Sequence, residues 1–272
     1  MNGGNVSRIS ATFERLARER RKALIPFFTA GDPTLSQCVP TMDAMVAGGA
    51  DLIELGIPFS DPMADGPTIQ RSSERALKQG VSLSDVLSAV AGFRQKNATT
   101  PIVLMGYANP IERMGRETFA ARCAQAGVDG VLVVDYPPDE ARQLAEHLKP
   151  LGIDSIFLLS PTSTDERVRE IASLATGYIY YVSLRGVTGA SHIDIGEVAQ
   201  QVARIKSMVR VPVGVGFGIR DDATAQALSR VADAIVVGSR IVEEIEVAAP
   251  GQASTAVGAL IKRFRQAMDG DQ

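Results

Sequence analysis

The chain has 272 residues, of which 45% are hydrophobic and 22% are charged, and its formal net charge is -3. This length suits a single barrel-type α/β domain, and the apolar content is enough for a large core. Basic and acidic residues are mixed along the sequence, which argues against a nucleic-acid surface. No apolar run reaches the roughly 18 residues that cross a bilayer. We therefore expect a cytoplasmic protein that binds neither nucleic acid nor membrane.

The two cysteines are far apart in the sequence and fall in helix-like segments. Cys38 and Cys123 show neither metal-ligand nor redox-motif spacing. Buried thiols in a reducing compartment are the default for such a pair. We expect no metal site and no disulfide.

Short apolar runs alternate with amphipathic stretches from end to end. The runs are bounded by Gly, Pro or Asp, as expected for strands of a parallel sheet that is buried on both faces. They are Ala23–Phe28, Asp51–Leu55, Pro101–Met105, Gly130–Val134, Asp154–Leu158, Tyr178–Val182, Pro212–Val215 and Ala234–Val237. Eight strand–helix units predict a closed (β/α)8 TIM barrel that forms one domain over residues 1–272. An open doubly wound sheet is the alternative, but the first strand leads into no glycine-rich dinucleotide loop.

Some segments exceed the basic barrel plan. An additional N-terminal helix is predicted over Ser10–Arg20, where it would cover the barrel floor, and Thr255–Met268 is a closing helix. The connections after the second and sixth strands are unusually long, from Gly56 to about Thr68 and from Leu184 to about Gly196. Both belong to the face on which barrels carry their chemistry, and long loops are often binding loops.

Glycine turns follow the seventh and eighth strands, and each leads into a helix. The first contains Gly216, Phe217 and Gly218, and the second contains Gly238 and Ser239. Glycine lets the backbone approach a ligand, and helix starts offer free N–H groups to an anion. Because barrels often hold phosphate after these two strands, we predict a phosphate site here. Whether Arg185 and Arg220 assist is left open.

A carboxyl group interrupts the second apolar run at its C-terminal end. An unpaired carboxyl such as Glu54 would have a raised pKa if buried, which suits proton exchange near neutral pH. A structural carboxylate with a buried partner is the alternative. Asp61 and Asp65 follow in the long loop, where aspartates are often simple turn formers.

The longest motif runs from Glu54 to Pro67 and reads ELGIPFSDPMADGP. It resembles the signature of the tryptophan synthase alpha subunit family. Matching segments follow the same order through the chain: PFFTAGDP from Pro26, MGYANP from Met105, GVTG from Gly186, and the two glycine turns. The resemblance therefore covers nearly the whole sequence.

The resemblance implies a lyase of tryptophan biosynthesis that cleaves indole-3-glycerol phosphate by a retro-aldol reaction to indole and glyceraldehyde 3-phosphate. Glu54 and Asp65 match the catalytic residues of the family. Glu54 would protonate carbon C3 of the indole ring, and it is also placed to accept the glycerol hydroxyl proton. Asp65 would bind the ring N–H and offset the developing positive charge.

The resemblance and the strand positions together imply a substrate site with an apolar part and a phosphate part. Thr188 matches a sixth-loop threonine that contacts the catalytic aspartate when the loop closes; a plain turn hydroxyl is the alternative. The role of His192 in this loop is open. The candidate substrate-binding residues are Phe27, Met105, Tyr107, Leu132, Val134, Tyr180, Thr188, Gly189, Phe217, Gly218, Gly238 and Ser239.

The resemblance also implies a partner. Family members hand indole to a β subunit that contains pyridoxal phosphate, in an α2β2 heterotetramer, and no cofactor is expected in this chain. Pro58 and Asp61 match the partner-contact surface, although they also suit a role in the active site alone.

Two other functions compete with this interpretation. Other phosphate-binding barrels, such as indole-glycerol-phosphate synthase or a phosphoribosyl isomerase, need a catalytic lysine or a different acid–base pair, and none of the eight runs contains lysine. The second alternative is a catalytically silent phosphate-ligand-binding subunit that only activates a partner enzyme. The presence of both Glu54 and Asp65 argues against it.

Overall fold

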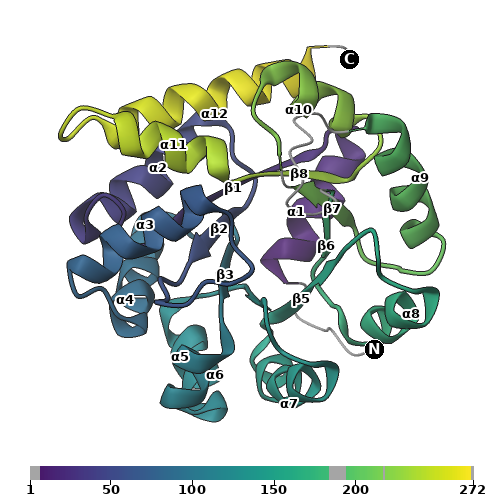
Figure 1. Cartoon of the computed structure of the whole chain (residues 1–272), viewed down its shortest axis with the longest axis horizontal. Helices are drawn as coiled ribbons and strands as arrows, with labels where there is room; N and C mark the ends of the chain where they lie inside the picture. The colour runs from purple at the N-terminus through teal and green to yellow at the C-terminus, as the bar shows by residue number, and fades with distance from the viewer. Residues whose placement is uncertain (1–6, 184–193, 217, 271–272) are drawn as a thin grey trace.

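A computed structural model describes residues 7–183, 194–216 and 218–270. Its eight strands pair in the order β1 to β8, all parallel, and β8 pairs back to β1 (Figure 1). The strands are β1 Ala23–Thr29, β2 Ile53–Gly56, β3 Ile102–Gly106, β4 Gly130–Val133, β5 Asp154–Leu159, β6 Ile179–Val182, β7 Val213–Gly216 and β8 Ala234–Val237. The predicted closed barrel is confirmed, and each strand lies within two residues of its predicted bounds.

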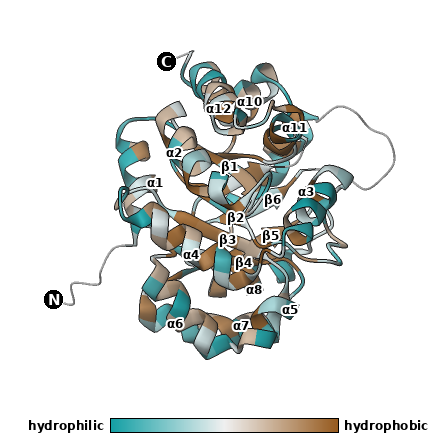
Figure 2. Ribbon diagram, turned by 90° about the vertical axis from the view of Figure 1, so that its left-hand side faces the viewer, coloured by the Kyte–Doolittle hydropathy of each residue, from teal (hydrophilic) through white to brown (hydrophobic). Residues whose placement is uncertain are grey.

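Helices surround the barrel and cover the outer face of the strands (Figure 1). Short 3-10 turns, η1 Leu35–Gln37 and η2 Lys149–Leu151, adjoin two of them. The helices are α1 Arg8–Arg18, α2 Cys38–Gly48, α3 Pro67–Lys78, α4 Leu83–Arg94, α5 Ala108–Met114, α6 Arg116–Ala126, α7 Pro138–Leu148, α8 Asp165–Leu174, α9 Ile195–Lys206, α10 Asp222–Ser229, α11 Ser239–Val247 and α12 Ala253–Asp269. In Figure 2 the strands are mostly apolar, and polar residues lie on the outer faces of the helices.

The additional N-terminal helix closes the bottom of the barrel, as predicted. Its buried residues Ile9, Phe13 and Leu16 pack into the cluster that fills the barrel interior. Arg8 bonds Asp129 at 2.7 Å, just before β4, and Ser7 bonds Asp154 at 2.6 Å, at the start of β5. Because α1 occupies the N-terminal ends of the strands, only their C-terminal ends remain open for a ligand.

Strand alternation decides which side chains enter the barrel. Successive residues of a strand point to opposite faces, so every second residue points inward. On β2, Ile53 and Leu55 belong to the layer between strands and helices, whereas Leu52, just before the strand, belongs to the barrel interior. This alternation places Glu54 inside, beside Phe27 of β1 and Val103 of β3 in the register.

The connection after β2 covers residues 57–66, which agrees with the predicted long loop. Most of the connection after β6, residues 184–193, lies outside the described residues. Among the helices that the structure describes, none has the length and apolar character needed to span a membrane.

Candidate active site

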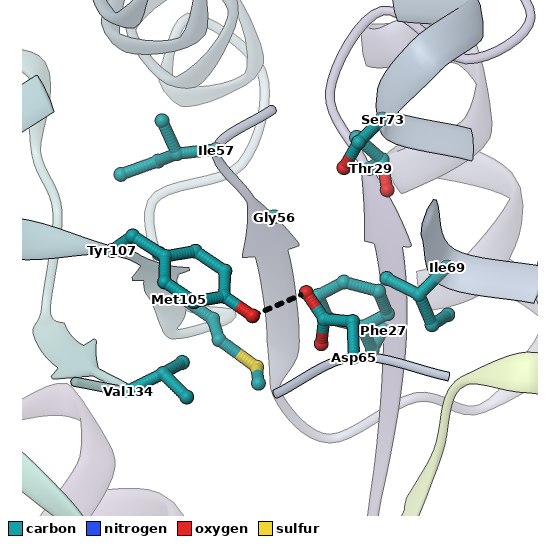
Figure 3. Close-up of a pocket in the computed structure, with 11 residues that line it drawn as sticks. Phe27, Thr29, Gly56, Ile57, Asp65, Ile69, Ser73, Met105, Tyr107 and Val134 are labelled. Atoms are coloured by element: carbon teal, nitrogen blue, oxygen red, sulfur yellow. Dashed lines mark hydrogen bonds between the residues drawn. The ribbon is translucent and has the colours of Figure 1, made fainter. Parts of the chain in front are cut away.

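A small pocket opens at the C-terminal ends of the first strands (Figure 3). Its wall combines apolar side chains of β1, β3 and α3 with the carboxyl group of Asp65 from the long loop. The lining residues are Phe27, Thr29, Gly56, Ile57, Asp65, Ile69, Ser73, Met105, Gly106, Tyr107 and Val134. Of the predicted site residues, the pocket therefore unites Phe27, Asp65, Met105, Tyr107 and Val134.

Glu54 is fully buried in the barrel interior. The hydroxyl of Tyr178 donates a hydrogen bond to its Oε1, and its Oε2 has no partner among the described residues. Burial raises the pKa of Glu54 to about 7, and the hydrogen bond from Tyr178 opposes that rise. No described arginine or lysine forms an ion pair with Glu54, and its described hydrogen-bond partner is the buried phenol of Tyr178. This geometry fits both the predicted acid–base group and the alternative of a structural carboxylate with a buried partner. A carboxyl group with this pKa exchanges a proton near neutral pH.

Asp65 is held at the pocket wall by a phenol. The hydroxyl of Tyr107 donates to its Oδ2 at 3.0 Å, and the backbone N–H of Ala64 donates to that same hydroxyl at 3.1 Å. Figure 3 shows this hydrogen bond, with the ring of Phe27 behind the carboxyl group. Burial raises the pKa of Asp65 to about 6, and the hydrogen bond from Tyr107 opposes the rise. At neutral pH Asp65 is therefore mostly a carboxylate, with one phenol donor.

Tyr180 lies within electrostatic range of both carboxyl groups, those of Glu54 and Asp65. Its pKa is raised by burial and then by the charges of both Glu54 and Asp65, so its phenol lies within range of each. The ring fits because β7 has a glycine beside it: a Cβ on Gly216 would be 2.3 Å from the phenol oxygen. Glu54 and Asp65 thus lie on different elements but within electrostatic range of one phenol, and only Asp65 is among the residues that line the pocket.

The predicted phosphate residues lie at the ends of β7 and β8. Gly218 has a φ of 79°, a conformation that favours glycine. Gly238 is the N-cap of α11 and Ser239 is its first residue, and no side chain caps this helix. The first N–H groups of such a helix lack intrahelical partners and point outward, as anion binding requires. Gly238 also lies near Phe27 of the pocket wall, since a Cβ on it would be 3.4 Å from that ring.

The remaining predicted residues are placed as follows. Leu132 and Tyr180 lie in the buried cluster of the barrel interior, against which Met105 and Val134 pack. Pro58 is buried, and Asp61 is exposed and accepts a 2.6 Å hydrogen bond from Ser60. Arg220 is exposed and pairs with Glu243 at 3.5 Å. The candidates that fall outside the described residues are Arg185, Thr188, Gly189, His192 and Phe217.

Sequence reasoning missed the partner of Glu54. Tyr178 was placed in a predicted strand but given no role, and it lies 124 residues from Glu54 in the sequence. The only sequence signal was a phenol in an inward-facing position of a barrel strand. The pocket-lining residues Thr29, Ile57, Ile69 and Ser73 were also missed. Ile69 and Ser73 repeat at helical spacing, which by itself indicates only a buried helix face.

Among the residues that the structure describes, no group of three or more His, Cys, Asp or Glu side chains is arranged to hold a metal ion. The site offers two carboxyl groups of raised pKa, three phenols and an apolar pocket. That set suits proton transfer to and from an aromatic substrate.

Known proteins resemble this chain over nearly its full length. The family model described as tryptophan synthase alpha chain matches residues 13–269. The tryptophan synthase alpha chain of Burkholderia multivorans is 60% identical over 265 residues, which cover 97% of this chain and 98% of that protein. That of Paraburkholderia phytofirmans is 58% identical over 264 residues, with the same coverage.

Solved structures agree with this result. The crystal structure of tryptophan synthase subunit alpha from Legionella pneumophila is 42% identical, has a TM-score of 0.91, and is matched over 97% of this chain and 99% of its own. A crystal structure of tryptophan synthase from M. tuberculosis in an aminoacrylate-bound form is 34% identical, with a TM-score of 0.86 and coverage of 96% and 99%. The chain belongs to the tryptophan synthase alpha chain family.

Proposed function

We propose that this chain cleaves indole-3-glycerol phosphate to indole and glyceraldehyde 3-phosphate through Glu54 and Asp65. The family is one of carbon–carbon lyases of tryptophan biosynthesis, and the chain is a member over nearly its whole length. The assignment of each step to a residue of this chain is the proposal. The single observation that carries it is the fully buried carboxyl group of Glu54, which has a pKa of about 7 and a free oxygen.

Glu54 is the proton donor and acceptor. Its acid form delivers a proton to indole C3, which gives a positively charged indolenium ring. The bond between C3 and the adjacent glycerol carbon then breaks, and its electron pair neutralises the ring. The hydroxyl on that carbon loses its proton to Glu54 and becomes the aldehyde. The carboxyl group is thus returned to its starting state, and a pKa of about 7 lets it act in both directions.

Asp65 stabilises the charge that develops on the ring. As a carboxylate it accepts a hydrogen bond from the indole N–H, whose acidity increases when C3 is protonated. Tyr107 keeps this carboxyl group in one orientation through the 3.0 Å hydrogen bond. The two acidic groups differ in role because they differ in environment: Glu54 has the higher pKa and is fully buried.

The substrate is bound at two ends. The apolar residues Phe27, Met105 and Val134 suit the indole ring, with Leu132 and Tyr180 below them in the barrel. The turns at Gly218, Gly238 and Ser239 suit the phosphate. Three further contacts lie outside the described residues and are proposed without structural support: Phe217 from its place after β7, and Thr188 and Gly189 from the family resemblance.

The name alpha chain implies a complex with a second kind of subunit. We propose that the partner is a β subunit that carries pyridoxal phosphate and consumes the indole, in an α2β2 assembly. Pro58 and Asp61 are the proposed contacts, and the exposed side chains of Asp61 and Met63 in the same loop support this. We further propose one barrel domain working in the cytoplasm, in keeping with its two unpaired buried cysteines.

The test uses the purified chain with indole-3-glycerol phosphate. We expect slow release of indole by the chain alone and a sharp rise when a β subunit is added. Release of indole by wild type but not by Glu54→Gln supports the assignment. A chain that releases no indole under either condition, yet still activates a β subunit, is the silent binding subunit instead.

A further inference from the structure

Two neighbouring helices begin at opposite ends of the proposed substrate site. Helix α3 starts at Pro67, two residues after Asp65, and helix α11 starts at Ser239, in the proposed phosphate site. The two helices pack against each other on the outside of β1 (Figure 1). We call the contact between them the α3–α11 seam. It physically joins the carboxylate end of the site to its phosphate end.

The inner part of the seam is apolar and reaches the pocket. Ile69 of α3, Val242 of α11 and Phe27 of β1 form a buried cluster of their own, with Met105 packed against it. Ile69 and Phe27 also line the pocket beside Asp65, as Figure 3 shows. Val242 lies one turn from Ser239 on the same helix. Val242 therefore connects the first turn of α11 to the pocket wall.

The outer part of the seam is a chain of ion pairs around Arg75. Its guanidinium binds both carboxylate oxygens of Asp32 at 2.8 Å each, and its Nη1 binds Glu246 of α11 at 3.0 Å. Arg71, one turn earlier on α3, binds both oxygens of Glu246 at 2.9 and 2.8 Å. Bidentate pairs of this kind fix orientation as well as adding energy.

The buried residue that anchors this network is Asp32. Asp32 has a fully buried side chain in the loop after β1, and it also accepts a 2.7 Å hydrogen bond from Ser72. A buried carboxylate with three such bonds holds Arg75 in one place, whereas the pairs of Arg75 and Arg71 with Glu246 are partly exposed and act together as a network. Arg75 thus ties α11 and α3 to one fixed point of the barrel.

We propose that Arg75 is a positioning residue through which phosphate binding at α11 and indole binding beside Asp65 become cooperative. This inference rests on the proposed function for the identity of the two ligands. An anion at Ser239 fixes α11, Glu246 and Arg75 transmit that position to α3, and the N-terminus of α3 then sets the place of Asp65. Two ligands that bias the same packed element affect each other's affinity equally.

The test measures this coupling directly. The chain has no tryptophan and five tyrosines, so the fluorescence of indole, excited at the long-wavelength edge of its absorption where phenols absorb little, reports its binding. Indole is titrated with and without saturating inorganic phosphate. For wild type we expect phosphate to tighten indole binding at least about 5-fold, the lower end of common coupling strengths. For Arg75→Gln we expect less than about 2-fold, with the affinity for phosphate alone nearly unchanged.

Matched variants separate positioning from general stability. Arg75→Lys keeps the charge without the bidentate geometry and should restore part of the coupling. Arg94→Gln breaks another buried arginine–aspartate pair, with Asp129 at the opposite end of the barrel. We expect it to lower the unfolding temperature and to leave the coupling intact. If Arg75→Gln fails to fold, the coupling is measured in Glu246→Gln instead, because this variant removes the link to α11 and leaves the Asp32–Arg75 pair in place.

Three results overturn the inference: wild type without coupling, a folded Arg75→Gln or Glu246→Gln with wild-type coupling, or an equal loss in Arg94→Gln. None of them bears on the proposed reaction, which is judged separately by the release of indole from indole-3-glycerol phosphate.

Discussion

The hydroxyl of Tyr178 donates a hydrogen bond to the carboxyl group of Glu54 across the inside of the barrel. Both side chains are fully buried. Burial pushes the pKa of Glu54 up and the phenol pushes it down, and the balance leaves it at about 7. Burial and the opposing hydrogen bond from Tyr178 therefore set the pKa of Glu54 together.

Replacing Glu54 removes the proposed proton donor. We expect Glu54→Gln to lower kcat for indole release by roughly 10²- to 10⁴-fold, the usual contribution of general acid–base catalysis. The affinity for inorganic phosphate should not change, since the glycine turns are untouched. Glu117→Gln, an exposed change on α6, is the control and should keep wild-type activity. Near-normal cleavage by Glu54→Gln would show that another group supplies the proton.

The two carboxyl groups predict a narrow bell-shaped pH profile of kcat/KM. Glu54 must be protonated and Asp65 ionised, so activity should fall above about pH 7 and below about pH 6. Initial rates across this range give the two apparent pKa values, which belong to the coupled pair. The substrate phosphate titrates near the lower limb, with a second pKa of about 6. Asp65→Asn separates the titration of Asp65 from that of the substrate phosphate, because only the part of the acidic limb due to Asp65 disappears in that variant.

Replacing Tyr178 or Tyr107 with phenylalanine should move one limb of the pH profile of kcat/KM. Without the hydrogen bond from Tyr178 the pKa of Glu54 rises, so Tyr178→Phe should move the basic limb to higher pH. Without that from Tyr107 the pKa of Asp65 rises, so Tyr107→Phe should move the acidic limb to higher pH. Tyr136→Phe, which loses a hydrogen bond to the exposed Glu112, is the control and should move neither limb. Identical profiles in all three variants would contradict the assigned pairs.

The raised pKa of Glu54 also predicts how stability changes with pH. Between about pH 4.5 and about pH 7 the folded chain keeps a proton that the unfolded chain releases. Stability from this group is therefore present at low pH and lost as pH rises through the folded pKa. Over this range the free energy of unfolding of the wild type should fall by about 3 kcal/mol more than that of Glu54→Gln. Urea unfolding of both proteins at the two ends of the range measures the difference, and equal losses would show that the pKa is not raised.

Substitutions at the glycine turns after β7 and β8 should weaken the binding of inorganic phosphate. Ser239→Ala should weaken the binding of inorganic phosphate roughly 10-fold, as expected for a lost hydrogen bond to a charged group. Gly218→Ala should weaken it too, because its φ of 79° strains any residue with a Cβ. Ser88→Ala, an exposed change on α4, is the control. Calorimetric titration gives the three affinities, and unchanged values for both Ser239→Ala and Gly218→Ala would contradict a phosphate site at these turns.

The fold was predictable because its signals are local. Each strand is a short apolar run with its own boundaries, and parallel strands buried on both faces need no information from distant residues to be recognised. The position of Glu54 at the end of a strand, and a raised pKa if it is buried, follow from the sequence in the same way. Its inward direction does not, because both faces of this strand are apolar.

The surroundings of that carboxyl group were not predictable. Tyr178 is 124 residues away, and Thr29 and Ser73 reach the pocket from different elements. A tyrosine on an inward strand position and a serine on a buried helix face have many ordinary uses. Only closure of the barrel selects which of them meet. The same holds for Arg75, whose partners come from the β1 loop and from α11.

The order of apolar runs in the sequence determined a (β/α)8 barrel with Glu54 at a strand end, and the motif from Glu54 to Pro67 indicated the tryptophan synthase alpha chain family by resemblance. The tertiary structure alone decided that Glu54 bonds a phenol and, among the described residues, no cation, and that Asp65 is held by Tyr107. The physical reason is that strand formation depends on neighbouring residues, whereas pKa and orientation depend on burial and on contacts between distant ones.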